Sequence, residues 1–189
     1  MKRFILLASL LLSASCATTP RSDLPHLRQV RPNVWAGGQP TPAGFRQLAT
    51  AFEGRKVHVI KLNFPTEGSD DAARLLGWDV HELGIEPRTD FKGIVAAGVE
   101  VFALPDQKVW ASVVEQILLI PAVDNGKDVW FGHCVNGNDR TNEFVGHVRV
   151  LVDRWTKDAA FDEMVSQGFH WQLVGLDRQW AKLPERRRE

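Results

Sequence analysis

The fold is decided by Phe131-Gly132-His133-Cys134-Val135-Asn136-Gly137-Asn138-Asp139-Arg140-Thr141. The stretch continues an apolar run that begins at Val129 and leads into a segment with helical period. This order predicts a buried strand, a short polar loop and a helix. A loop at a helix N-terminus directs unpaired backbone N–H groups inward and adds the positive end of the helix dipole. Because Gly137 can turn the chain with positive φ, these amides can converge on one anion.

Two side chains give this anion-binding loop its chemistry. The field of the helix N-terminus favours thiolate over thiol at Cys134. Arg140 offers a planar, permanently charged fork that matches two phosphate oxygens. The pattern therefore predicts a loop that holds a phosphoryl group with a thiolate beneath it.

The run HCVNGNDRT, residues 133–141, fits every fixed position of His-Cys-x-x-Gly-x-x-Arg-Ser/Thr. It resembles the signature of the protein tyrosine and dual-specificity phosphatase superfamily. Two further regions are similar to bacterial members, and with the loop they cover nearly all of residues 33–183: Val34-Trp35-Ala36-Gly37-Gly38-Gln39-Pro40 near the start, and Gly168-Phe169-His170 with Gly175-Leu176 near the end.

The resemblance implies phosphomonoester hydrolysis through a phosphocysteine on Cys134, with no cofactor and no metal. Thr141 would hydrogen-bond the sulfur and help it leave, and His133 would orient the loop. The resemblance also implies a set of phosphate-binding residues: Val135, Asn136, Gly137, Asn138, Asp139 and Arg140. The substrate expected is a phosphoprotein or a small phosphomonoester.

The general acid that protonates the leaving group has three candidates. Asp106 is the first choice because it follows a proline in a separate upstream loop, although it could instead cap the helix that begins near Val109. Asp90 is the second candidate. Asp139 is the third, since myotubularin-type phosphatases also carry an Asp just before the loop arginine.

Three positions depart from the commonest patterns of the superfamily. Asn142 stands where a glycine often follows Arg-Thr. Val135 and Asn138 stand where phosphoinositide phosphatases often carry lysine, which disfavours a polyanionic lipid or inositol phosphate. The alternative to an enzyme is a phosphatase fold that binds phosphate without turnover.

The rest of the sequence predicts an α/β fold. Apolar residues step with helical period over 45–52, 109–118 and 144–155, and Val57–Leu62 is typical of a strand covered on both faces. Strands that alternate with helices predict a three-layer sandwich around a central, mostly parallel sheet of about four to five strands. In such sheets the reactive loops lie at the carboxyl ends of the strands.

Composition excludes two other classes of protein. Lys+Arg and Asp+Glu balance at 23 each, so nucleic-acid binding has no support from charge. The six histidines are scattered and no cysteine or carboxylate cluster has ligand spacing, so no metal centre is predicted.

The first residues predict export. Residues 1–15 combine a basic start with a short apolar run and small residues, as in a signal peptide. Cys16 follows as in a bacterial lipobox, and no Asp comes after it, which resembles outer-membrane lipoproteins of Gram-negative bacteria. We expect residues 16–32 to form a lipidated, flexible tether and residues 33–189 the phosphatase domain. The protein would be periplasmic, with the lipid as its only membrane contact; the alternative is a soluble exported protein cleaved nearby.

Overall fold

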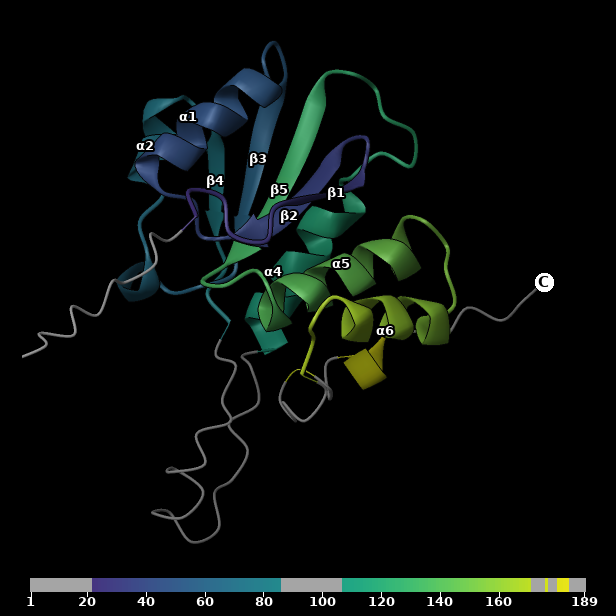
Figure 1. Cartoon of the computed structure of the whole chain (residues 1–189). Helices are drawn as coiled ribbons and strands as arrows, with labels where there is room; N and C mark the ends of the chain where they lie inside the picture. The colour runs from purple at the N-terminus through teal and green to yellow at the C-terminus, as the bar shows by residue number, and fades with distance from the viewer. Residues whose placement is uncertain (1–21, 86–106, 171–175, 177–179, 184–189) are drawn as a thin grey trace, which may run out of the picture.

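A computed structural model describes residues 22–85, 107–170, 176 and 180–183. The described residues form one five-stranded sheet with strand order β1-β2-β5-β3-β4 (Figure 1). Its strands are β1 (Arg28–Arg31), β2 (Val34–Gly38), β3 (Lys56–Lys61), β4 (Asp79–Glu82) and β5 (Asp128–Cys134). All neighbouring strands pair in parallel except β1 and β2, which are antiparallel. The predicted mostly parallel sheet is confirmed.

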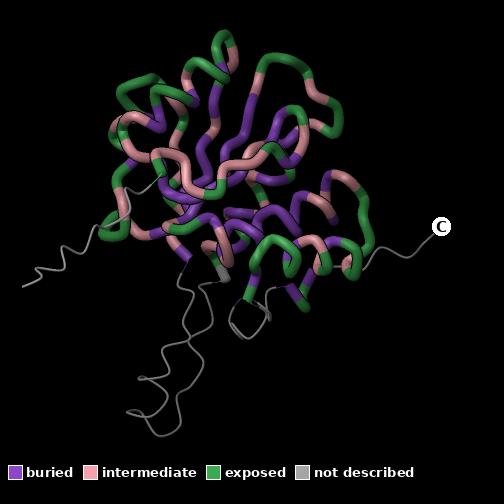
Figure 2. The backbone as a smooth tube through the Cα atoms, viewed as in Figure 1, coloured by how far each residue is buried: buried purple, intermediate pink, exposed green. Residues whose placement is uncertain are grey.

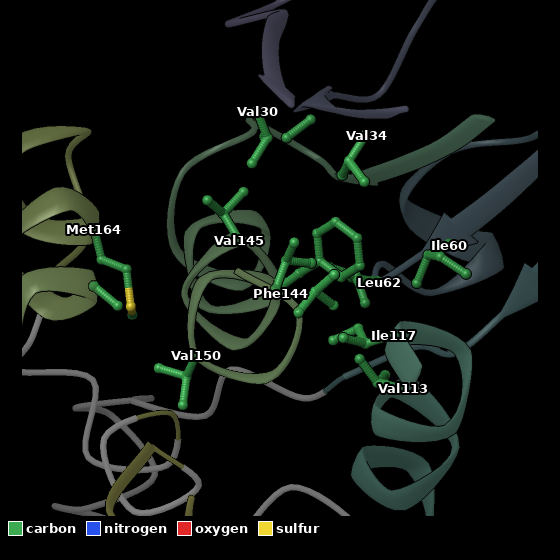
Figure 3. Packing of buried hydrophobic residues seen from close by; sticks show 14 of the residues in the cluster. Val30, Val34, Ile60, Leu62, Val113, Ile117, Phe144, Val145, Val150 and Met164 are labelled. Carbon is green, nitrogen blue, oxygen red and sulfur yellow. The ribbon is translucent and has the colours of Figure 1, made fainter. Parts of the chain in front are cut away.

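Helices cover both faces of this sheet, which confirms the three-layer α/β sandwich (Figure 1). The helices α1 (Pro42–Ala51) and α2 (Asp71–Leu75) lie on one face, where Phe45 and Leu48 pack with Val59 and Phe131. On the other face lie α4 (Gln107–Leu118), α5 (Asp139–Leu151) and α6 (Lys157–Ser166). There Phe144 of α5 packs among Ile60, Leu62, Val113 and Ile117 (Figure 3).

The central strands are buried because each contributes apolar side chains to both layers. Along β5, Val129 and Phe131 join the α1 side while Trp130 joins the α4–α5 side. This alternation follows from the two-residue repeat of a strand. Figure 2 shows the burial along these strands, in contrast to the exposed loops at their amino ends. The carboxyl ends of β2, β3 and β5 are thereby rigid supports for whatever loops follow them.

The predicted tether is wrong for residues 22–32. Residues 28–31 form β1, whose Val30 is buried in the core. The segment before β1 is also bound to the domain, because Gly38 N–H donates to Pro25 O at 2.7 Å and Thr41 N–H donates to Asp23 O at 3.1 Å. A short edge strand rich in charge, beside prolines, carries little periodic signal.

Other boundaries differ slightly from the prediction. The helix predicted to reach Trp155 ends at Leu151, since Val152 is its C-cap and Arg154 has a positive φ of 67°. The signal sequence, Cys16, Asp90 and Asp106 lie outside the described residues. Among the described helices, none is both long enough and apolar enough to cross a membrane.

Candidate active site

The signature loop starts where three parallel strands end. Strand pairing places Cys134 of β5 beside Gly38 of β2, and His133 beside Lys61 of β3. The Cys134 side chain is buried, with 3% of its surface exposed. Residues 135–138 then turn the chain into α5, as the sequence predicts. The site thus lies at the carboxyl edge of the sheet, where open α/β sheets bind their ligands.

The loop backbone packs directly on the end of β2. Gly137 has φ of 80°, and a Cβ atom on it would lie 2.5 Å from the nitrogen of Gly38. A Cβ atom on Gly38 would lie 2.9 Å from the carbonyl carbon of Asn136. Gln39 N–H donates to Val135 O at 3.1 Å. The segment Gly37-Gly38-Gln39-Pro40 therefore packs against the loop backbone and fixes its conformation. The sequence did not predict this role.

Arg140 is held in the first turn of α5 by a carboxylate and two carbonyl groups. Its Nη1 donates to Leu62 O at 3.3 Å and Ile85 O at 3.2 Å, and its two terminal nitrogens lie 2.8 and 3.0 Å from the oxygens of Glu67. Burial works to lower the pKa of Arg140, but the hydrogen bond to Glu67 and the negative charge on Cys134 raise it above its ordinary value. The guanidinium is thus fixed and charged.

Sequence reasoning did not find Glu67, which lies in the short 3-10 helix η1 (Pro65–Glu67) after β3. Hydrogen bonding to Arg140 lowers the pKa of Glu67 below its ordinary value, against the opposing effect of partial burial. Its carboxylate also accepts from Phe64 N–H at 2.8 Å, which fixes the helix. The only sequence signal was a carboxylate placed just after a buried strand.

His133 belongs to a chain of buried polar side chains beneath the loop. Its Nε2 lies 2.8 Å from Asp70 Oδ2, and neither side chain is exposed. Asp70 Oδ1 accepts from Gln39 Nε2 at 2.7 Å, and Gln39 Oε1 accepts from Asn63 Nδ2 at 3.0 Å. Burial alone would raise the pKa of Asp70, but the hydrogen bonds from His133 and Gln39, with nearby positive charge, lower it. This chain ties β2, β3 and α2 to the strand that carries Cys134.

Thr141 and Asn142 anchor the start of α5. The Thr141 hydroxyl donates to Gly37 O at 3.1 Å, so its hydrogen bond to the Cys134 sulfur stays a prediction. Asn142 is buried, its oxygen accepts from the Arg28 guanidinium, and its Nδ2 donates to Gln167 O at 2.9 Å. The asparagine that stands here in place of glycine therefore links β1, α5 and the end of α6.

Arg28 and His26 of the N-terminal segment border the loop. Arg28 Nη1 lies 3.5 Å from Gly137 O, and His26 Nδ1 lies 2.7 Å from Asn138 Oδ1. Burial lowers the pKa of Arg28, and the negative charges of Glu163 and Cys134 act in the opposite direction. The segment predicted as a tether thus contributes a cation beside the anion-binding loop.

Of the three candidate acids, the structure places only Asp139. Its Oδ1 accepts a hydrogen bond from His170 N–H and lies 2.8 Å from His170 Nδ1. Asp90 and Asp106 lie outside the described residues.

We predict that Asp70→Asn destabilises the fold by about 2 kcal/mol at neutral pH, because it removes the charge from a buried hydrogen-bonded pair. Since the folded-state pKa of Asp70 is below 3.8, its contribution is complete above that pH and is lost as the pH falls through the lower folded value. Urea unfolding of the wild-type chain and of Asp70→Asn between pH 7 and pH 3 should show that the difference in their free energies of unfolding becomes smaller at the acid end.

The neighbouring carboxylate provides a matched control. Asp71 is 81% exposed, so Asp71→Asn should change the free energy of unfolding by less than about 0.5 kcal/mol. Equal effects of the two substitutions would contradict a stabilising role for the Asp70–His133 pair.

Comparison with known proteins agrees with this geometry. The sequence matches no protein-family model. Over 76 residues it is 36% identical to the dual specificity protein phosphatase TpbA of Pseudomonas aeruginosa, a match that covers 39% of this chain and 34% of that protein. The chain thus spans about a third of the length of this curated relative.

Solved structures extend the likeness to nearly the whole chain. The crystal structure of P. aeruginosa TpbA has a TM-score of 0.52 at 19% identity, covering 85% of this chain and 86% of that one. The catalytic core of Siw14, a protein of S. cerevisiae, has a TM-score of 0.59 at 18% identity, covering 87% and 89%. At these identities the likeness shows the fold. In its fold, its complete signature loop and its partial sequence match, the chain is similar to the protein tyrosine and dual-specificity phosphatases.

Proposed function

We propose that the chain hydrolyses phosphate monoesters through a phosphocysteine intermediate on Cys134. The observation that carries the proposal is the arrangement of Cys134, the loop backbone and Arg140. The sulfur lies at the base of a loop that begins a helix, and the guanidinium is held beside it by Glu67. The sequence match to a dual specificity protein phosphatase supports the same activity.

The first step is a displacement at phosphorus. The Cys134 thiolate forms an S–P bond while the bond from phosphorus to the ester oxygen breaks. The loop N–H groups and Arg140 stabilise the charge on the equatorial oxygens in the transition state. The leaving oxygen takes a proton from an aspartic acid, for which Asp106 is the first candidate.

The second step releases phosphate and restores the thiolate. Water attacks phosphorus, the carboxylate formed in the first step accepts its proton, and the S–P bond breaks with its electrons returning to sulfur. The Thr141 hydroxyl would assist this departure by turning from Gly37 O toward the sulfur; the support is that Thr141 lies in the first turn of α5, directly after Arg140.

We propose a phosphoprotein or a small phosphomonoester as the substrate. Val135 and Asn138 give the loop itself no cationic side chain. Arg28 lies beside the loop, but its guanidinium is bound to Asn142 and Gly137 O. This arrangement offers one firmly held cation, Arg140, for one phosphate group, and it favours a monoester over a clustered polyphosphate.

We expect the purified chain to hydrolyse p-nitrophenyl phosphate in reductant and EDTA, and Cys134→Ser to abolish this turnover because serine is not ionised at neutral pH. Arg140→Lys should lower kcat about 100-fold or more, since lysine cannot form the bidentate contact. Arg149→Lys is the matched control on the same helix, because Arg149 pairs with Glu163 and Asp153 away from the loop. A folded wild-type chain that binds vanadate without turnover would instead be a phosphate-binding pseudophosphatase.

The general acid can be identified by comparing leaving groups. Asp106→Asn should lower kcat about 100-fold or more with phenyl phosphate and much less with p-nitrophenyl phosphate, whose leaving oxygen needs less protonation. The same variant should lose the fall in kcat that deprotonation of the acid causes at higher pH. Asp90→Asn and Asp139→Asn are the comparison variants, and the assignment fails if either shows this pattern in place of Asp106→Asn.

We also propose that the protein is exported to the periplasm and anchored in the outer membrane by lipid on Cys16. The support is the signal-like sequence before Cys16 and the absence of Asp after it. In a Gram-negative host, the full chain should appear in the membrane fraction and incorporate labelled palmitate, and Cys16→Ser should abolish both. Cys134→Ser is the matched control and should remain in the membrane. Loss of the palmitate label in Cys134→Ser, in place of Cys16→Ser, would contradict the proposal.

A further inference from the structure

Three potential metal ligands meet on β3 and β4, away from the signature loop. His58 lies on β3, and Asp79 and His81 lie on the edge strand β4. One nitrogen or oxygen atom from each lies within 4.8 Å of the other two. Asp79 Oδ2 is 3.4 Å from His58 Nδ1 and 3.4 Å from His81 Nε2.

The two spacings to Asp79 Oδ2 fit a tetrahedral ion. Ligand atoms that each lie about 2.0–2.2 Å from one zinc ion are separated from each other by about 3.3–3.6 Å in a tetrahedral site. The Nε2 atom of His81 is buried and has no hydrogen-bond partner in the described part of the chain. A buried ring nitrogen without a partner is costly, and an ion between it and Asp79 would satisfy it.

The remaining nitrogen of His58 has the contact that a metal-binding histidine requires. His58 Nε2 lies 3.2 Å from Asp128 Oδ1, and Asp128 Oδ2 accepts from Asn125 Nδ2 at 2.9 Å. When Nε2 donates its proton to Asp128, the lone pair of Nδ1 faces Asp79. Histidine ligands of metal ions commonly donate their second N–H to a carboxylate in this way. The His58 ring is also stacked on Trp130, with 4.8 Å between ring centroids.

Strand pairing explains why sequence spacing conceals this cluster. His58 is paired with Asp79, and Ile60 with His81, so the three side chains share one face of the sheet. The ligands come from two strands that are joined through η1, α2 and the loops around them. No local motif can therefore contain all three ligands.

We propose that His58, Asp79 and His81 bind one Zn²⁺ ion, with a fourth position open to water. Two imidazoles and one carboxylate are suited to zinc, whereas Mg²⁺ and Ca²⁺ prefer oxygen ligands. Asp79 is 46% exposed, which gives the ion a path from solvent. The bound ion would link the edge strand β4 to β3 and stabilise the sheet. Trp130, beside the cluster, lies about 13 Å along β5 from Cys134, so the site is separate from the proposed active site.

The test uses the full chain with Cys16→Ser and Cys134→Ser, so that no thiol competes for zinc. After removal of metal with a chelator, titration calorimetry with Zn²⁺ should show saturable binding of one ion per chain, with a rise in Tm. Mg²⁺ should produce neither effect. His58→Ala and His81→Ala should abolish the binding, and Asp128→Asn should weaken it about 10- to 100-fold through loss of the contact that orients His58.

Two further variants keep the test decisive. Asp79→Asn removes an exposed carboxylate and is expected to fold, which urea unfolding without metal can verify, yet it should weaken zinc binding and remove the rise in Tm. His170→Ala removes an exposed histidine outside the cluster and should bind zinc like the parent chain. The proposal is overturned if no saturable binding occurs at millimolar zinc, or if one ion still binds when either cluster histidine is replaced.

Discussion

The backbone of the signature loop lies directly against the backbone at the end of β2, with no side chain between them. The contact exists because Gly38 and Gly137 have no Cβ atoms, which would otherwise overlap the opposite backbone. Two hydrogen bonds stabilise this contact: Gln39 N–H donates to Val135 O, and the Thr141 hydroxyl donates to Gly37 O. The loop that carries Cys134 therefore has its shape before any ligand binds. A site organised in advance spends less binding energy on ordering its own groups.

Charge around the loop is balanced in pairs, because a buried charge without a partner is costly. Arg140 pairs with Glu67, and buried Lys61 donates to Gly68 O at 2.7 Å and lies 3.2 Å from Glu82 Oε1. Pairing with Glu67 fixes the Arg140 fork but offsets much of its charge. The attraction for a phosphate group must then also come from the loop amides and the start of α5. The geometry thus favours precise placement of an anion over a strong long-range field.

The sequence predicted the sheet, the helices of both layers and the loop well, because each has a local signature: apolar periodicity, a turn glycine or a complete motif. It did not predict β1, a short charged edge strand that depends on pairing with β2 for its structure. It also missed Glu67 and Asp70, which act through partners 73 and 63 residues away. Such contacts depend on which strands become neighbours, and no local pattern specifies that. Likewise, nothing in the local sequence marked Asn142 as the link between β1 and α6.

The register of β3 against its neighbouring strands determines the positions of both the His58 cluster and Lys61. Its Lys61 points to the α1 side with Val59, whereas His58 shares the opposite face with Ile60. A shift by one residue would reverse both faces, because side chains alternate along a strand. It would separate His58 from Asp79 and Trp130 and remove Lys61 from Glu82 in the same event. An ion that links β3 to β4 would therefore oppose this one-residue shift, which would also separate Lys61 from Glu82. The ion would do so although it lies far from the Cys134 sulfur.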